Sequence, residues 1–311
     1  MLSNVSKSIL ATLAYFDIFD YPLTLGELHR NLFFPQAKKA ELPDILELES
    51  AQKRLNRYID SVDGFYFLRG RTEISALRLA RYGLAIKKMK RAKLFAKLIA
   101  AMPYVRGIAL SNNLAYQNAS ERSDIDLMII AAPGRVWTAR FFVKSLMRVL
   151  RQNPTPTDKK NKICLSFIVS ENELDISRFM LPEKEGTPDI HYIYWASQFM
   201  PIFGVEAWQK FAKSNGWLLN YLPNFYPPAV HHEISAAPGM FLRGLKKILE
   251  KRGASEDFYK KIQLRIMPAE VKEAMNKNTA VVVNGNVLKF HTNDRRELYR
   301  EKYLAALGQL Q

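Results

Sequence analysis

The segment from residue 104 to residue 170 constrains the fold more than any other part of the chain. It contains three short apolar runs, YVRGIAL, SDIDLMIIAA and KICLSFIV, which have the length and composition of buried β-strands. A polar segment, SNNLAYQNASER, separates the first two runs, and an amphipathic segment, GRVWTARFFVKSLMRVL, lies before the third. The pattern predicts strand, turn, strand, helix and strand, and therefore a sheet covered by helices in an α+β protein.

Two carboxylates stand at the start of the second apolar run. Asp124 and Asp126 are separated by one residue, and side chains alternate along a strand, so both should point to the same side. Two carboxylates on one side can hold Mg²⁺, a hard cation that prefers oxygen ligands. An Asp-x-Asp pair also occurs in ordinary surface turns. The residues around the pair therefore decide between a metal site and a surface turn.

The surrounding run, SDIDL at residues 123–127, resembles the catalytic motif of the nucleotidyltransferase superfamily of DNA polymerase beta, residue for residue. The resemblance covers residues 104–170. It implies a nucleotidyltransferase-like mixed sheet that transfers a nucleoside monophosphate from an NTP to a hydroxyl acceptor. It also implies that Asp124 and Asp126 are the catalytic residues and the ligands of a metal cofactor, Mg²⁺ or Mn²⁺.

The turn before this motif departs from the family pattern. The family has Gly and Ser where this chain has Asn112 and Asn113, and these two residues, with Ser123, are the nucleotide-binding candidates. Asn tolerates a left-handed backbone, and its amide can donate a hydrogen bond to a phosphate. The family also places a third carboxylate on the next strand, but the run at residues 162–169 contains no acid. Two functions therefore stay open: an active nucleotidyltransferase, or a catalytically impaired protein of the same fold that acts as a nucleic-acid-binding regulator.

Residues 1–75 have the pattern of an N-terminal module. Three helical segments are followed by an Asp63-Gly64 turn and the apolar run FYFL, which predicts a hairpin. Three helices and a hairpin resemble a winged helix-turn-helix. In a winged helix-turn-helix the third helix and the wing contact nucleic acid through their cations. In the alternative interpretation, the cations on these two elements are simply solvated. The candidate contacts are Lys53, Arg54, Arg57, Arg69 and Arg71.

Residues 76–102 are expected to form a basic linker helix. One face of this helix is crowded with cations that have no acid among them, so an anionic neighbour such as nucleic acid would relieve their repulsion. The predicted apolar face consists of Leu79, Tyr82, Ile86, Met89 and Leu94. The candidate nucleic-acid contacts are Lys87, Lys88 and Arg91.

The rest of the chain divides into a nucleotidyltransferase-like core at residues 103–177 and a mostly helical region at residues 178–311. The second region includes a predicted helix at residues 189–203 and a hairpin near residues 280–291, with Asn284-Gly285 as its turn. Its tryptophans either pack in the core, which helical spacing favours, or stack on a nucleobase. They are Trp195, Trp208 and Trp217. A cluster of cations near the C-terminus either contacts substrate or phosphate or is simply exposed, and we favour exposure; its members are Lys289, His291, Arg295 and Arg296.

Composition narrows the class of protein. The chain has 311 residues, is 48% hydrophobic and carries a formal net charge of +16, which favours a folded protein with anionic partners such as NTPs or nucleic acid. Its single cysteine, Cys164, excludes an intrachain disulfide and a cysteine zinc site. The N-terminus does not resemble a signal peptide, and no apolar run reaches the roughly 18 residues of a membrane span. We therefore expect a cytoplasmic protein with no membrane partner; the acceptor, the NTP and the oligomeric state stay open.

Overall fold

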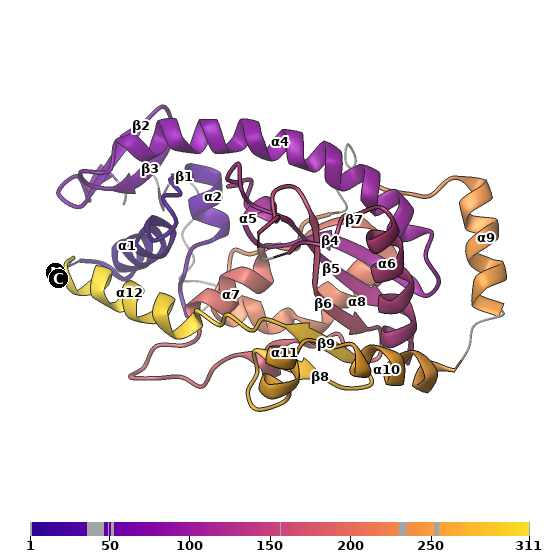
Figure 1. Cartoon of the computed structure of the whole chain (residues 1–311). Helices are drawn as coiled ribbons and strands as arrows, with labels where there is room; N and C mark the ends of the chain where they lie inside the picture. The colour runs from indigo at the N-terminus through magenta and orange to yellow at the C-terminus, as the bar shows by residue number, and fades with distance from the viewer. Residues whose placement is uncertain are drawn as a thin grey trace.

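The computed structural model describes residues 2–35, 47–48, 50, 53–155, 157–229, 235–251 and 255–310. It is an α+β protein in which helices surround a mixed β-sheet, as predicted (Figure 1). None of the helices that it describes is long and apolar enough to cross a membrane. The helices are α1 (Asn4–Asp17), α2 (Leu25–Arg30), α4 (Glu73–Ala100), α5 (Asn112–Ala115), α6 (Val136–Val149), α7 (Ile190–Ser197), α8 (Val205–Ser214), α9 (Met240–Lys251), α10 (Glu256–Arg265), α11 (Ala269–Ala274) and α12 (Arg296–Gly308).

The central sheet has the strand order β7-β4-β5-β6-β9-β8. Its strands are β4 (Val105–Leu110), β5 (Ile125–Ala131), β6 (Ile163–Ser170), β7 (Met200–Phe203), β8 (Val281–Val283) and β9 (Val287–Phe290). β5 and β6 run parallel, and the other neighbouring pairs are antiparallel. Helix α6 joins the parallel pair, because parallel neighbours need a crossover connection. The predicted order of elements over residues 104–170 is therefore confirmed.

Strands from the C-terminal third complete this sheet. β7 lies at one edge and the β8–β9 hairpin at the other, so the predicted boundary at residue 177 does not separate a sheet from a helical region. The segment at residues 189–203 is not one helix, because α7 ends before β7 begins. Pro201 fits in β7 because an edge strand leaves one row of backbone groups outside the ladder.

The C-terminal hairpin near residues 280–291 is confirmed, but its turn lies one residue further along the chain. The backbone N–H of Asn284 donates to Val287 O (2.9 Å), so Gly285 and Asn286 are the two central residues. The side-chain oxygen of Asn284 also accepts hydrogen bonds from the backbone N–H groups of Asn286 and Val287 (2.8 Å each). Asn284 therefore closes the turn with its side chain and does not occupy a central position.

Alternate residues of β5 enter two separate hydrophobic cores. Ile125 and Leu127 belong to the core beneath α4 and α6. Met128 belongs to the core that the sheet shares with α1, α7 and α8. Asp126 is two residues before Met128, so the pleat directs its carboxylate to the second side of the sheet.

The predicted orientation of α4 is wrong for four of its five predicted inward residues, and only Met89 is buried as expected. Leu79 and Leu94 are 55% and 58% exposed, whereas Arg78 and Lys88 are each 5% exposed. α4 runs along the molecule from the N-terminal sheet to the central sheet (Figure 1). Its two buried cations meet polar groups of other segments: Arg78 donates to Glu27 Oε1 (3.0 Å) and to Gln117 O (3.1 Å), and Lys88 donates to loop acceptors. A basic side chain surrounded by acceptors can be buried, which apolar spacing alone does not reveal.

The N-terminal part contains α1, α2 and a sheet in the order β1-β3-β2. Asp63 and Gly64 both have positive φ (51° and 78°) between paired strands, so the predicted hairpin is confirmed. The predicted third helix, at residues 46–59, is described only in part: Lys53 is helical, residues 54–58 form turns and a strand begins at Ile59, so the helix does not reach its predicted end. The winged-helix arrangement stays a prediction. The strands are β1 (Leu23–Thr24), β2 (Ile59–Val62) and β3 (Phe65–Leu68).

This N-terminal part packs directly on the C-terminal region. The ring of Tyr15 on α1 stacks on Tyr194 of α7 with centroids 4.2 Å apart, and the Tyr15 hydroxyl hydrogen-bonds to His191 Nδ1 (3.0 Å). α12 lies beside α1 (Figure 1). The segment predicted as a separate module at residues 1–75 therefore supplies a wall in front of the central sheet.

Candidate functional site

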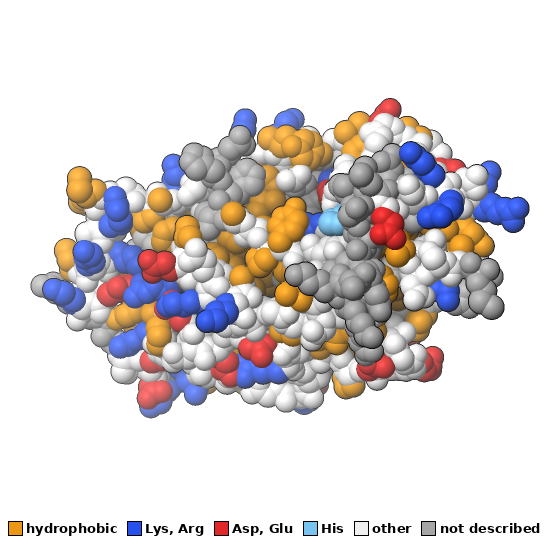
Figure 2. Space-filling model, turned by 180° about the vertical axis from the view of Figure 1, so that it is seen from behind, with side chains coloured by type: hydrophobic (Ala, Val, Ile, Leu, Met, Phe, Trp, Pro, Cys, Tyr) orange, Lys and Arg blue, Asp and Glu red, His pale blue; other side chains and the backbone are white. Residues whose placement is uncertain are grey.

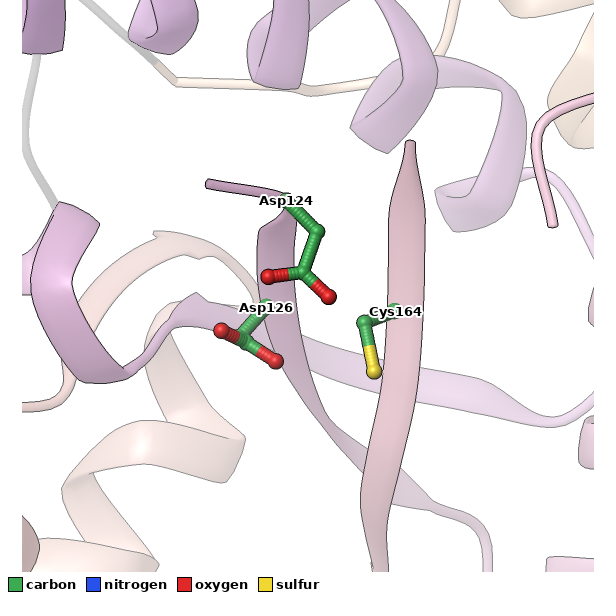
Figure 3. Close-up of side chains that lie close together, drawn as sticks. All are labelled: Asp124, Asp126 and Cys164. Carbon is green, nitrogen blue, oxygen red and sulfur yellow. The ribbon is translucent and has the colours of Figure 1, made fainter. Parts of the chain in front are cut away.

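The two aspartates lie beside the only cysteine of the chain. Asp126 in β5 is in register with Cys164 in the parallel strand β6. Figure 3 shows both carboxylates and the thiol between the two strands. Ligand atoms from Asp124, Asp126 and Cys164 all lie within 4.8 Å of one another, a spacing that suits one divalent cation. Cys164 thus stands on the strand where the family resemblance predicts a third carboxylate.

Asn112 occupies the turn next to this cluster. It begins α5 with φ of 52°, the left-handed conformation that Asn tolerates. Its Oδ1 accepts a hydrogen bond from Trp195 Nε1 (2.8 Å), and its side chain also hydrogen-bonds to Asp126. The side chain of Asn112 therefore fills the space beside Asp126 that a glycine would leave open, and it links the carboxylate to α7.

Ser123 and Lys88 hold the loop that leads into β5. The Ser123 hydroxyl donates to Ser120 O (3.0 Å), and its carbonyl accepts from Lys88 Nζ (2.7 Å). Lys88 Nζ also donates to Asn161 Oδ1 (2.8 Å) in the neighbouring loop. Ser123, predicted to contact nucleotide, lines neither of the two cavities described next, so its contacts support a positioning role for the loop before Asp124.

Two cavities meet at Asp126. The basic cavity, of about 410 Å³, is lined by Cys164 and by cationic side chains from the β9–α12 region. The aromatic cavity, of about 210 Å³, is lined by Asn113 and by rings from the N-terminal part. The residues common to both are Asn112, Asp126, His191, Trp195 and Tyr299. The rings of the aromatic cavity are those of Tyr15, Phe16, Phe19, Tyr21 and Tyr116.

The electrostatics of the carboxylate pair favour binding of a cation. Burial raises the pKa of Asp126 to about 7, and the charge of Asp124 makes the second-largest contribution. Hydrogen bonds from Asn112 and Cys164 act in the opposite direction and lower this pKa. Burial also raises the pKa of Asp124, which the nearby Lys159 opposes. Without a cation the pair therefore resists carrying two negative charges, and a bound cation would remove this penalty.

The basic cavity contains buried as well as exposed cations. Lys289 and Arg296 are 1% and 6% exposed, so the expectation that they are solvated is wrong. Arg296 is fixed by Asp294, whose Oδ2 accepts from Nη2 (2.6 Å). Burial, followed by the charge of Arg296, lowers the pKa of Lys289 to about 7. Lys159 and Arg295 line the same cavity from exposed positions.

His191 lies where the two cavities join. Burial, with a smaller contribution from Arg296, lowers its pKa to about 4, so the imidazole is neutral at pH 7. Its ring lies 4.4 Å from the ring of Tyr299. His191 and Trp195 are four residues apart on α7, which is the spacing that places two side chains on one face of a helix.

The predicted nucleic-acid contacts differ in their exposure. Lys53, Arg54, Arg57, Arg69 and Lys87 are exposed. The other three are less exposed. Arg71 forms ion pairs with Asp17 and Asp20, Arg91 donates from Nε to Asn161 O (3.0 Å), and Lys88 is buried. The charged groups of these three cations are therefore engaged in contacts within the protein.

Several residues of the site were not predicted. Cys164 was interpreted as a buried small residue, although the pairing of two parallel strands at their amino ends could have placed it beside Asp126. His191 could have been found from its i,i+4 relation to Trp195. The sequence indicates Lys289 as one possible contact of substrate or phosphate, but Tyr299 carries no such signal, because the last helix reaches the site only through tertiary packing.

Comparison with known proteins adds no family to this description. No protein-family model, curated protein or solved structure matches the chain. A fold class alone does not imply a function, so the case rests on the residues of the site.

Proposed function

We propose that the chain is a metal-dependent nucleotidyltransferase that transfers a nucleoside monophosphate from an NTP to a hydroxyl acceptor. The observation that carries this proposal is the position of Asp126 where a basic and an aromatic cavity meet, with Asp124 beside it in the same cluster of ligand atoms. The basic cavity suits a charged group, and the aromatic cavity suits a flat, weakly polar group. A nucleotide contains both, because its phosphates are charged and its base is flat.

The donor set fits a divalent cation. Asp124 and Asp126 would hold Mg²⁺ or Mn²⁺, and the Cys164 sulfur is near enough to take part. When bound, the cation would neutralise charge on the phosphates during transfer. A sulfur ligand is softer than a carboxylate oxygen, so the set favours Mn²⁺ over Mg²⁺.

The basic cavity would receive the triphosphate. Lys289 and Arg296 are held in place by Thr279 and Asp294, so binding would cost them little side-chain freedom, and a phosphate beside Lys289 would favour its protonated form. Lys159 and Arg295 approach the same space from the rim and would close on the outer phosphates. The chain's own contribution is thus to orient the phosphate chain toward Asp126.

The aromatic cavity would receive a planar, weakly polar group. Its tyrosine and phenylalanine rings offer stacking surfaces, and the amides of Asn113 and Asn118 offer hydrogen bonds. A nucleobase meets both requirements. The N-terminal part would then serve the active site directly, because α1 supplies Tyr15, Phe16 and part of the cavity wall.

A catalytically impaired regulator is the second candidate, and one observation favours it. The side chain of Asn112 occupies the space beside Asp126, and the described residues around the pair include no third carboxylate. The proposed binding of nucleic acid by such a regulator loses support from Lys88, Arg91 and Arg71, whose charged groups are engaged within the protein.

Calorimetry separates the two candidates. ATP, GTP, CTP and UTP are titrated into the metal-free protein and into protein with Mn²⁺. We expect Mn²⁺ to tighten binding of at least one NTP, and Asp124→Ala to abolish this gain. Glu183→Ala, a change of an exposed acid outside both cavities, is the matched control. An equal affinity with and without Mn²⁺ for all four nucleotides would rule out the metal-dependent enzyme.

A further inference from the structure

Helix α9 presents most of its apolar side chains to solvent, and of these apolar residues only Leu242 and Leu249 are half-buried. Met240 and Phe241 are 82% and 83% exposed, and Leu245 and Ile248 are 40% and 53% exposed. No residue of α9 is buried. In Figure 1 the helix stands at the end of the molecule, beyond the central sheet. A helix with one apolar stripe normally buries that stripe against the core, so α9 is oriented the opposite way.

The polar side of α9 attaches it to the protein. Lys246 Nζ donates to Val105 O (2.5 Å) and to Ala100 O (3.1 Å). Glu250 Oε1 accepts from Tyr104 N (2.7 Å) and from Arg106 Nη1 (2.8 Å). These specific polar contacts fix the rotation of the helix, and they hold the apolar stripe outward.

The outward surface of α9 is also cationic. Arg243, Lys247 and Lys251 are exposed beside the apolar stripe, and the single acid of the helix, Glu250, is engaged in the contacts just described. Figure 2 shows further lysine and arginine side chains next to hydrophobic ones at this end of the molecule. The partner of this surface must therefore accept apolar side chains and provide negative charge.

We propose that α9 binds the surface of an anionic lipid membrane. The acyl region accepts Phe241, Leu245 and Ile248, and the lipid phosphates pair with the flanking cations. At about 1.5 Å per residue, twelve residues are too short to span a bilayer, so the helix lies in the interface. This proposal departs from the sequence-based expectation of no membrane partner.

Other occupants fit the surface less well. A second copy of α9 would bring like charges together at the same place. Nucleic acid would pair with the cations but would leave the apolar stripe in water. An anionic membrane satisfies both sets of side chains at once, and it does not depend on the function of the Asp126 site.

The test is flotation of the full chain with vesicles. One preparation contains phosphatidylcholine alone, and the other contains phosphatidylcholine mixed with phosphatidylglycerol. We expect binding to the anionic vesicles that weakens as salt rises. Changing Phe241 and Ile248 together to Ser should reduce the bound fraction roughly tenfold or more. The control changes Leu79 and Ile86, exposed on α4, to Ser and should bind as the parent does.

Further variants and the oligomeric state distinguish an anionic membrane from a second copy of the chain as the partner of α9. Changing Arg243 and Lys247 together to Gln should also reduce binding, and circular dichroism checks that every variant is folded. Equal binding to both kinds of vesicle, or an apolar variant that binds like the parent, would overturn the proposal. If the parent ignores vesicles but forms a dimer that the apolar variant loses, a second copy of the chain is the partner and the proposal is wrong.

Discussion

The carboxylate of Asp126 should destabilise the metal-free protein at neutral pH. Its pKa of about 7 in the folded protein lies above the ordinary value of 3.8. Well below pH 3.8 the group is protonated in both folded and unfolded chains, so it makes no difference to stability. As pH rises toward 7 the unfolded chain ionises freely and the folded one resists, so the free energy of unfolding falls. Asp126→Asn removes this penalty.

The magnitude follows from the same shift. A pKa of about 7 against 3.8 corresponds to roughly 4 kcal/mol for a fully buried, isolated group. Because Asp126 is half-buried and interacts with Asp124, we expect solvent screening to reduce the gain to about 1–2 kcal/mol at pH 8. For a chain of this size that is a rise of about 2–6 °C in Tm. The gain should be smaller at pH 5 than at pH 8.

Denaturant or thermal unfolding at pH 5 and pH 8, with EDTA present, measures this effect. Glu183→Gln, which neutralises an exposed acid, is the control and should change stability little at either pH. An Asp126→Asn variant that is less stable than the parent at both pH values would refute the reasoning. It would show that the hydrogen bonds of Asp126 with Asn112 and Cys164 hold the strand together and that the carboxylate is an anchor.

Three further changes test the site and its supports. Cys164→Asp should strengthen Mg²⁺ binding relative to Mn²⁺ in calorimetry, because it replaces a soft ligand with a carboxylate; a Cys164→Ser variant that does the same would contradict this. Lys88→Met should cost about 1–3 kcal/mol in denaturant unfolding because it removes the donor that three acceptors share, whereas the exposed neighbour Lys87→Met should cost little. Gly204→Ala should lower stability by several kcal/mol, because a Cβ there would lie 2.0 Å from Arg106 O at φ of 85°, and a neutral result would show that the β7–α8 turn adapts.

The sequence by itself determined the elements around the Asp-x-Asp pair. The apolar runs of residues 104–170 are long enough and apolar enough to be buried strands whatever packs on them, and α6 has one continuous apolar side. The side to which Asp126 points also follows from local geometry, because alternation along a strand needs no knowledge of the partner strands. Those predictions depend on near neighbours in the chain, and they are confirmed.

Tertiary structure decided the orientation of α4. The leucines and the cations of α4 are each spaced so that they could form the face that packs against the protein. In most helices the apolar residues form that face. Loop carbonyls and carboxylates from residues distant in the sequence happen to lie under it, and they pair Arg78 and Lys88. A pattern within one helix cannot report acceptors that other segments supply.

Tertiary structure also assembled the cleft. Lys289 lies on a hairpin that becomes the neighbour of β6, Tyr299 belongs to the last helix, and Tyr15 belongs to the first. Cys164 faces Asp126 only because β5 and β6 pair in one register out of several. The sequence alone thus determined the two carboxylates and the strand that carries them. What surrounds those carboxylates depends on contacts between residues far apart in the chain, and local preferences contain no information about such contacts.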